Sequence, residues 1–384
     1  MTINNEHKKL NVPNLRFPEF EGEWEESTIG EMFDLYSGNT PSRLNKEHFK
    51  GTVNWISSGE LKEHYIYSSK EQISEEAAKS LKLLPVGTFV IAIYGLEAEG
   101  VRGTGSITQE PSTISQACMS FIQKGEIGNE FLYSWYKKHG NVIGIRYAQG
   151  TKQQNLSYDI LEKFRIVYPK TKEQEKLNKL ISLLDERIST QNKIIEDLKK
   201  LKSAISENLF KEVKGDVVML SEICEISKGK QINGEFLSEK GKYYVMNGGT
   251  EPSGYYNNYN VEANTISISE GGNSCGYVQF NTSPFWSGGH CYTILEIADN
   301  VDNLYLYHFL KSKENDIMKL RIGSGLPNIQ KKDLAMFKIK IPTVEQQKAI
   351  STFLSSLERK TEIEERTQNA MQKEKQYLLR QMFI

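Results

Sequence analysis

The sequence predicts an α+β fold in which two tandem, pseudo-repeated α/β domains are joined by two long antiparallel coiled-coil helices, with approximate two-fold symmetry. Three observations lead to this prediction. The second half of the chain repeats the first, each repeat begins with short β-type runs between turn residues, and each ends in a long heptad pattern. The expected boundaries are a first domain with an N-terminal extension over 1–170, a first spacer helix over 171–214, a second domain over 215–342 and a second spacer helix over 343–384.

The composition is ordinary for a soluble protein and excludes several other classes. Of 384 residues, 38% are hydrophobic and 25% are charged, which excludes a disordered or collagen-like chain. No stretch reaches the roughly 18 consecutive apolar residues of a membrane helix, and the first residues lack the apolar segment of a signal peptide. The cysteines form no Cys-x-x-Cys pair, so we expect reduced thiols in a cytoplasmic protein and no metal site.

An internal repeat organises the chain. An offset of 173 residues aligns the second half with the first from Cys118 to Phe210 without a gap. Towards the front of each repeat the offset is 191, so the first repeat carries 191 − 173 = 18 additional residues. The matched pairs include Cys118 and Cys291, Gly150 and Gly323, Asn155 and Asn328, Pro169 and Pro342, Gln174 and Gln347, and Phe210 and Phe383.

The front part of each repeat predicts a small α+β domain with many loops. Short β-type runs occur at 87–94, 265–269 and 291–295, and Gly, Asn and Ser separate them. Aromatic and leucine residues at helical spacing predict one helix in each repeat, around 129–140 and around 302–313.

The rear part of each repeat predicts a long helix. Residues 172–212 contain neither Pro nor Gly, and seven of nine seam positions are apolar in the series Ile181, Leu184, Ile188, Gln191, Ile195, Leu198, Lys202, Ile205, Leu209. The second helix has a polar middle over 358–370 between the apolar residues Phe353, Leu354, Leu357 and Met371, Leu378, Met382. Such helices are about 60 Å long. We expect them to pair antiparallel as spacers; the alternative is that each lies along its own domain.

The sequence contains no motif of a self-contained enzyme. A phosphate-binding Gly-x4-Gly-Lys-Ser/Thr loop, His-Glu-x-x-His and Gly-x-Ser-x-Gly are all absent, and no acidic cluster recurs in both repeats. A duplicated active site would repeat its acids and bases. The residues that repeat here are Gly, Asn, aromatic residues and a proline.

Positive charge collects around equivalent loops, although the net charge of the chain is −1. Window 311–340 holds 8 basic and 3 acidic residues, and its counterpart 138–167 holds 5 and 2. Such loops suit phosphate contacts and recognition of base edges, although an ordinary solvated face remains open as an alternative. The candidate DNA-binding residues are Arg102, Arg146, Lys152, Gln153, Asn155, Lys319, Arg321, Asn328 and Lys331.

A second set of loops differs between the repeats. In the first repeat this set comprises Tyr94-Gly95, Arg102-Gly103 and Gln116. The corresponding loops of the second repeat contain residues 270–273 and His290. Their glycines suit either close approach to a duplex or tight turns. Related scaffolds with different loops are expected to recognise different targets.

These residues resemble a known family. The opening VPNLRFPEFEGEWEESTIGEMF (12–33), the segment GGNSCGYVQFNTSPFWSGGHCYTI (271–294) and the helix entries PKTKEQEKLNKLISLLDERI (169–188) and PTVEQQKAISTFLSSLERK (342–360) resemble the specificity subunit of type I restriction–modification systems. The resemblance covers essentially the whole chain.

The resemblance implies a non-catalytic subunit that binds double-stranded DNA. Its two domains would be target recognition domains, each recognising half of a split asymmetric sequence. Two methyltransferase subunits would carry out N6-adenine methylation, and restriction subunits would cleave unmodified DNA. S-adenosylmethionine, Mg and ATP would belong to these partners, with no cofactor in this chain. Inserting one helical turn, about 6 Å, into both spacers should widen the gap in the target by about one or two base pairs. A two-headed adaptor that binds protein or glycan is the alternative.

Overall fold

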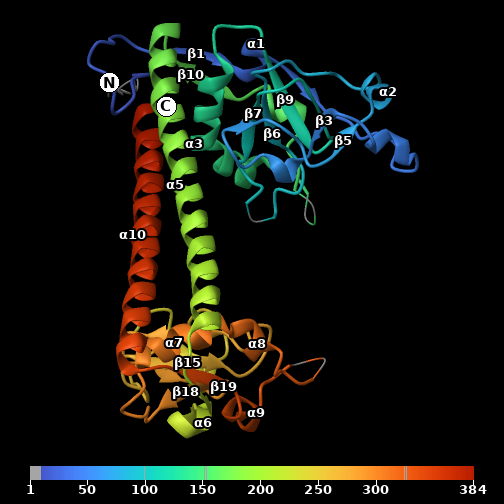
Figure 1. Cartoon of the computed structure of the whole chain (residues 1–384). Coiled ribbons are helices and arrows are strands. Elements are labelled where there is room, and N and C mark those ends of the chain that lie inside the picture. Colours follow the sequence, from blue (N-terminus) through green and yellow to red (C-terminus); the bar gives the residue numbers. More distant parts are fainter. Residues whose placement is uncertain (1–9, 99, 151, 153, 324, 326) are drawn as a thin grey trace, which may run out of the picture. The chain divides into compact units, whose positions relative to one another are not determined.

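A computed structural model describes residues 10–98, 100–150, 152, 154–323, 325 and 327–384. The chain divides into two compact units. Unit 1 comprises Met1–Asn192 with Thr367–Ile384, and unit 2 comprises Lys193–Arg366. Each unit therefore contains one globular domain together with segments of both long helices (Figure 1).

Unit 1 is built on a mixed five-stranded sheet with the order β2-β9-β6-β7-β4. Its strands are β2 (Phe33–Ser37), β9 (Cys118–Gln123), β6 (Phe89–Ala92), β7 (Gly105–Thr108) and β4 (Tyr65–Ile66). A second sheet contains β5 (Gln72–Ile73), β3 (Val53–Ile56) and β8 (Ser112–Ile114), and β1 (Glu25–Thr28) pairs with β10 (Arg165–Tyr168). The helices are α1 (Ile29–Met32), α2 (Glu75–Ala78), α3 (Asn129–Tyr147) and α4 (Tyr158–Leu161). All four residues of β6 are buried, and aromatic residues of α3 pack on this strand.

Unit 2 has the same arrangement without a counterpart of β4. Its main sheet has the order β12-β18-β15-β16, with β12 (Glu225–Lys228), β18 (Cys291–Leu295), β15 (Thr265–Ser269) and β16 (Val278–Asn281). A second sheet contains β14 (Tyr255–Tyr256), β13 (Tyr243–Met246) and β17 (Trp286–Ser287), and β11 (Asp216–Met219) pairs with β19 (Lys338–Ile341). The helices are α6 (Leu220–Ile223), α7 (Asn303–Ser312), α8 (Glu314–Met318) and α9 (Lys331–Ala335).

The strand pairing confirms the repeat that the sequence predicts. The order β2-β9-β6-β7 recurs as β12-β18-β15-β16, and the parallel pair β3–β8 recurs as β13–β17. A hydrogen bond at the start of a short helix also recurs. The Glu31 carboxylate accepts from the Thr28 amide, and the Glu222 carboxylate accepts from the Met219 amide. These bonds close the first turns of α1 and α6. The predicted helix around 129–140 continues to Tyr147, because apolar residues continue to face the core to Ile143.

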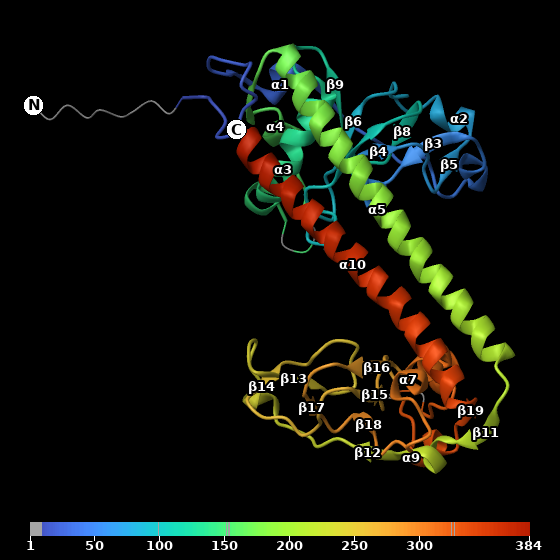
Figure 2. The same cartoon turned by 60° about the vertical axis from the view of Figure 1, so that its left-hand side comes forward.

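The long helices are α5 (Thr171–Glu212) and α10 (Val344–Met382). Within unit 1, Lys375 pairs with Asp185 and Gln368 with Asn192. Within unit 2, Lys202 Nζ lies 2.6 Å from Glu358 Oε1 and Lys199 Nζ lies 2.6 Å from Glu365 Oε1. In both units the partner number falls as the residue number rises, so the paired segments run antiparallel, as predicted (Figure 2).

The predicted seam of α5 is confirmed, whereas the apolar residues of α10 do not all lie on its seam. None of the nine seam positions from Ile181 to Leu209 is exposed. On α10, Leu354 is fully buried, but the neighbouring Phe353 is 46% exposed and lies off the seam. The apolar residues alone did not define the heptad, because polar residues such as Gln368 and Lys375 occupy seam positions and bind across to α5.

Candidate functional site

The predicted DNA-binding residues lie in or near two equivalent loops, 149–155 and 322–328. In unit 1 the Gln149 amide donates to the Asn155 carbonyl at 2.8 Å, and the Asn155 amide donates to the Gln149 carbonyl at 2.9 Å. In unit 2 the Ile322 amide donates to the Asn328 carbonyl at 2.8 Å, and the Asn328 amide donates to the Ile322 carbonyl at 3.0 Å. Each loop begins with a glycine at positive φ, 110° for Gly150 and 95° for Gly323, a conformation that other residues rarely adopt. The matched glycines and asparagines therefore close the same turn twice.

In unit 1 this turn is bound to the preceding loop over 95–104. The Leu96 amide donates to the Gln154 carbonyl at 3.1 Å, and the Gln154 amide donates to Glu97 Oε2 at 2.8 Å. Arg102 Nη2 donates to Gln154 Oε1 at 3.1 Å. The stem of Arg102 lies against Gly144 of α3, where an added Cβ would come within 2.6 Å of Arg102 Cγ. A glycine in α3 thus leaves the space that Arg102 occupies.

The other predicted residues of unit 1 lie around the same turn. Arg146 is exposed in the last turn of α3, and Lys152 is exposed within the turn. Asn155 is half-buried, and its Oδ1 is buried without a hydrogen-bond partner. Gln153 lies outside the described residues. Gln154, which joins Arg102 to the turn, is not among the predicted residues, because its role depends on contacts between two loops.

In unit 2 the predicted residues surround the equivalent turn, but one of their positive charges is paired with a carboxylate. Arg321, Asn328 and Lys331 are exposed, and Lys331 is the first residue of α9. Lys319 Nζ lies 2.8 Å from Asp316 Oδ1, so a carboxylate compensates its charge. The Gly272 amide donates to the Pro327 carbonyl at 3.0 Å, which binds the loop after β15 to the turn.

A polar cluster at the start of this loop combines Glu270 and His290, from the loops that differ between the repeats, with Lys228 and Tyr292, which were not predicted. Glu270 is only 6% exposed. Its Oε1 lies 2.6 Å from Lys228 Nζ and 3.1 Å from the Tyr292 hydroxyl. Its Oε2 has no hydrogen-bond partner and lies 3.8 Å from Nδ1 of the exposed His290. The offsets 191 and 173 show that the first repeat has Ser, Ala and Met in place of Lys228, His290 and Tyr292. Neither offset brings Glu270 opposite its structural counterpart, so the sequence alone reveals only part of this cluster.

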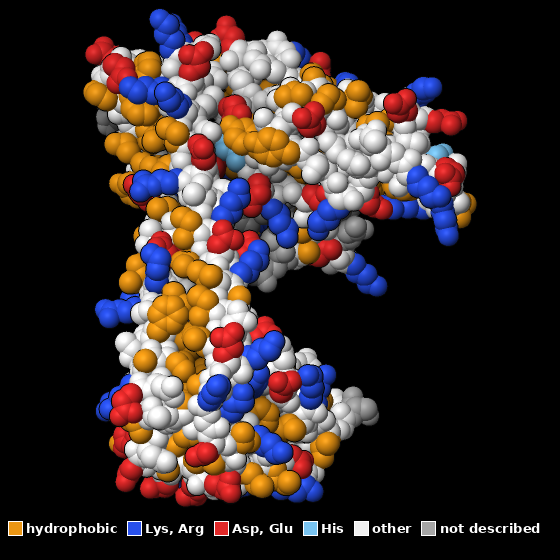
Figure 3. Space-filling model, in the orientation of Figure 1, with side chains coloured by type: hydrophobic (Ala, Val, Ile, Leu, Met, Phe, Trp, Pro, Cys, Tyr) orange, Lys and Arg blue, Asp and Glu red, His pale blue; other side chains and the backbone are white. Residues whose placement is uncertain are grey.

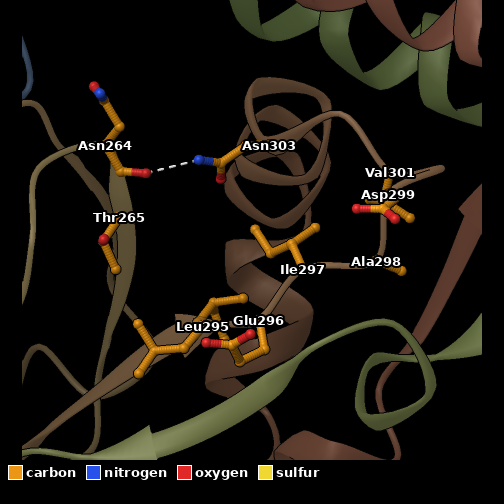
Figure 4. A pocket seen from close by; sticks show the side chains of 10 residues that line it. Asn264, Thr265, Leu295, Glu296, Ile297, Ala298, Asp299, Val301 and Asn303 are labelled. Carbon is orange, nitrogen blue, oxygen red and sulfur yellow. Dashed lines mark hydrogen bonds between the residues drawn. The ribbon is translucent and has the colours of Figure 1, made fainter.

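A hollow of about 410 Å³ lies at the opposite end of the same sheet (Figure 4). Its lining includes Asn264 at φ 59° and Glu296 at φ 45°, and Asn303 Nδ2 donates to the Asn264 carbonyl at 2.6 Å. Among the described residues that line it, Glu296 and Asp299 are the only charged ones. Two carboxylates without a cation do not suit a nucleic-acid phosphate, so we place no DNA contact there.

The described cysteines do not provide a nucleophile. Burial raises the pKa of Cys118 and Cys224 to about 12 and that of Cys291 to about 11, and burial also raises the pKa of Cys275. These thiols therefore stay protonated at neutral pH. Among the described residues there is no group of three His, Cys, Asp or Glu side chains able to hold a metal ion. No helix in the described part of the chain has the length and apolar character needed to span a membrane.

Comparison with known proteins identifies the same architecture. Residues 21–200 and 212–373 each match a family model described as the type I restriction modification DNA specificity domain. The chain is 24% identical over 410 residues to the type I restriction enzyme MjaVIII specificity subunit of Methanocaldococcus jannaschii, an alignment that covers 95% of this chain and 92% of the relative.

Other similarities cover less of the relative or concern the fold alone. The MjaIX specificity subunit of the same organism is 28% identical over 194 residues, which cover 49% of this chain and 44% of the relative. The chain thus spans less than half the length of this relative. A crystal structure of a type I restriction–modification S subunit from M. genitalium has a TM-score of 0.68 and 20% identity, and covers 97% of this chain and 99% of its own.

Proposed function

The chain belongs to the type I restriction modification DNA specificity family, and from this premise we propose that it is the subunit that selects the DNA target of a type I system. Each of its two domains recognises one half of a split, asymmetric sequence. The chain itself is non-catalytic, and the chemistry is carried out by the subunits that it positions on DNA.

One observation carries this proposal: the two domains share strand order and the bridge that closes the turn, but differ in the loops around the turn. The turns 149–155 and 322–328 have the same bridge, whereas the loops bound to them, 95–104 and 270–276, differ in length and sequence. Arg102 donates to Gln154 of the first turn, and the Glu270 carbonyl accepts from Ile329, the residue after the second turn. Equal scaffolds with unequal side chains suit recognition of two different half-sites.

The partners follow from the same proposal. Two methyltransferase subunits bind the repeated scaffold and supply S-adenosylmethionine-dependent N6-adenine methylation, while restriction subunits supply Mg- and ATP-dependent cleavage. Hydrophobic side chains are exposed along the long helices (Figure 3). In unit 2 they include Ile194 (40% exposed), Leu201 (51%), Phe353 (46%) and Ile363 (51%). Exposed apolar groups suit a protein partner, and we assign these side chains to the contact with a methyltransferase subunit.

The experiment that tests the function is base-resolution sequencing of N6-methyladenine in the source cell, with and without this gene. Loss of methylation from one split motif, with the partner methyltransferase still expressed, is the expected result. Unchanged methylation under these conditions would refute the proposal and favour a two-headed adaptor. Purified chain bound to DNA should also show steep weakening with salt, as counterion release requires, whereas glycan binding would respond little.

A further inference from the structure

Lys228, Glu270, His290 and Tyr292, here called the Glu270 cluster, place a buried carboxylate at the loop end of the main sheet of unit 2. Lys228 ends β12, Glu270 follows β15 and His290 precedes β18, so three strands converge there. The side chains of Lys228 and His290 are 51% and 62% exposed, whereas that of Glu270 is 8% exposed. Two exposed side chains that can donate hydrogen bonds thus lie beside a buried carboxylate, which accepts from Lys228 and lies 3.8 Å from His290 Nδ1.

The backbone under this cluster has a counterpart in unit 1. The Glu270 amide donates to the His290 carbonyl at 2.9 Å, and the Ile93 amide donates to the Ala117 carbonyl at 2.9 Å. The Glu270 and Ile93 carbonyls then accept from the matched residues Ile329 and Leu156, at 2.8 and 2.9 Å. Lys228 pairs with Tyr292 across β12 and β18, as Ser37 pairs with Met119 across β2 and β9. The residues equivalent to the cluster are therefore Ser37, Ile93, Ala117 and Met119.

The fold does not need the polar cluster, because the first repeat builds the same backbone without it. Burying a carboxylate costs free energy unless charged and polar partners compensate it. Unit 2 keeps this carboxylate, and its Oε2 has no hydrogen-bond partner. A costly group that one repeat has and the other lacks is expected at positions where the two domains differ in target.

The cluster adjoins the predicted DNA-binding turn. Gly271 forms a bridge with Asn328, and the Tyr292 hydroxyl lies 3.0 Å from the Ile329 carbonyl. Gly248 has a positive φ of 88°, and an added Cβ there would lie 3.0 Å from His290 Cβ. The glycine at position 248 thus lets this loop pass close to His290 and to the loop after β15.

We propose that the Glu270 cluster determines the specificity of the second domain by donating hydrogen bonds from Lys228 and His290 to the acceptor edge of a guanine. This inference rests on the proposed function. Guanine presents only acceptors, O6 and N7, at its major-groove edge. The Lys228 ammonium has three donors, of which Glu270 takes one, so others remain for a base. Because Glu270 compensates the charge and fixes the position of Lys228, the pair suits a base edge better than a phosphate. Glu270 acts as the positioning residue.

The first repeat supplies the variants for the test, since its residues fit the same backbone. The full chain is co-expressed with its methyltransferase subunits as wild type, Lys228→Ser and His290→Ala, and all methylated sites are sequenced. Both variants should lose discrimination at one G·C pair of one half-site by at least tenfold, with the other half-site unchanged. Glu270→Gln, which keeps the shape, should relax the same position. Lys338→Ser, on β19 of the separate β11–β19 sheet, is the matched control and should leave both half-sites unchanged.

A second measurement does not depend on how the variants fold. Wild-type complex is bound to duplexes in which 7-deazaguanine, which lacks the N7 acceptor, replaces each guanine of the target in turn. Replacement of at least one guanine should weaken binding at least fivefold, and where the variants fold, that guanine should lie in the half-site that they identify. Insensitivity at every guanine, or variants that lower methylation while both half-sites keep their discrimination, would overturn the inference. Absence of any split methylated motif in wild-type cells would instead refute the proposed function.

Discussion

Gln174 and Gln347, which lie 173 residues apart, make the same three hydrogen bonds in the two units. Nε2 of Gln174 donates to the carbonyls of Pro169 and Glu126 at 2.8 and 3.2 Å, and its Oε1 accepts from the Gly128 amide at 3.1 Å. Nε2 of Gln347 donates to the carbonyls of Pro342 and Asn300 at 2.9 and 3.0 Å, and its Oε1 accepts from the Asp302 amide at 2.8 Å. Each glutamine therefore joins the start of a long helix to the segment that begins α3 or α7.

Gln347→Leu is expected to destabilise unit 2 by about 2–3 kcal/mol, because it leaves buried backbone groups without partners. Gln347 is fully buried, whereas its neighbour Gln346 is exposed. Gln346→Leu is therefore the matched control and should change the free energy of unfolding by less than about 0.5 kcal/mol. Urea unfolding with amide exchange of unit 2 measures both. Equal effects of the two variants would show that the hydrogen bonds of Gln347 do not stabilise the unit.

A second repeated contact fixes the far end of each long helix. Phe210 of α5 packs on Tyr305 and Phe309 with ring centroids 5.7 and 5.3 Å apart, and Phe383 packs on Phe131 at 5.3 Å. Both phenylalanines are at most 2% exposed. Phe210→Ala should destabilise unit 2, and Phe383→Ala unit 1, each by about 3–5 kcal/mol. Amide exchange resolved by unit distinguishes these effects, and destabilisation of the wrong unit would contradict the prediction.

Phe353→Ala should separate stability from assembly. Phe353 is 46% exposed, so the substitution should leave the unfolding free energy nearly unchanged. If the exposed residues of the helices bind a methyltransferase subunit, the same variant should weaken that binding at least tenfold, which calorimetry can measure. Tyr377→Ala removes a comparably exposed side chain from α10 in unit 1 and provides a second probe. Unaltered affinity in both variants would exclude this face as the binding site.

The register of the repeat was predictable from the sequence, whereas its chemistry was only partly so. Gly150 and Gly323 identify the turns, because positive φ restricts the residue type and leaves a signal at one position. Gln174 and Gln347 also align, but their three partners come from segments that only the fold brings together. The packed face of α10 was not predictable from apolar spacing, because polar residues such as Gln368 and Lys375 form part of its seam. The residues of the Glu270 cluster match their counterparts in the first repeat at three different offsets, so no single gap-free alignment brings all of them into register.

Two buried histidines predict opposite pH responses of the two units. Burial lowers the pKa of His64, but hydrogen bonds with Asp185 and Glu130 raise it by more, so the net pKa lies above its usual value. Protonation of His64 therefore stabilises unit 1 below about pH 6.5, and this contribution is lost as the pH rises through the folded pKa. Burial instead lowers the pKa of His308 to about 4. Unit 2 is then stabilised above about pH 6.5 and loses about 3 kcal/mol as the pH falls towards 4.

Unfolding followed by amide exchange between pH 4.5 and 8.5 checks these signs. His64→Gln should remove the loss of unit 1 stability on raising the pH, and His308→Gln should remove the loss of unit 2 stability on lowering it. Each variant serves as the control for the other unit. The same sign of response in both units would contradict the assignment of neutral His308 and charged His64.

Arg102 and Gly144 predict a steric effect on DNA recognition by the first domain. An added Cβ at Gly144 would lie 2.6 Å from Arg102 Cγ, so Gly144→Ala should displace Arg102 from Gln154. Gly144→Ala and Arg102→Ala should then weaken binding of the cognate target by similar factors, about tenfold, since a good base or phosphate contact contributes about 1–3 kcal/mol. Their combination should not be additive. Full additivity would show that Gly144 acts on DNA binding by another route.

Lys331 and Lys319 provide a matched test of phosphate contact in the second domain. Both are exposed, but Asp316 lies 2.8 Å from Lys319 and compensates its charge. Because each phosphate contact contributes about −0.9 to the slope of log K against log salt concentration, Lys331→Ala should make that slope less steep by about 0.9. Lys319→Ala should change it little, since the ammonium already has a carboxylate partner. Binding of the full complex to its target between 50 and 300 mM salt, values chosen to span about a sixfold range, measures both slopes. If Lys319→Ala instead makes the slope less steep than Lys331→Ala does, Lys319 and not Lys331 contacts a phosphate, and Lys319 has left Asp316 to do so.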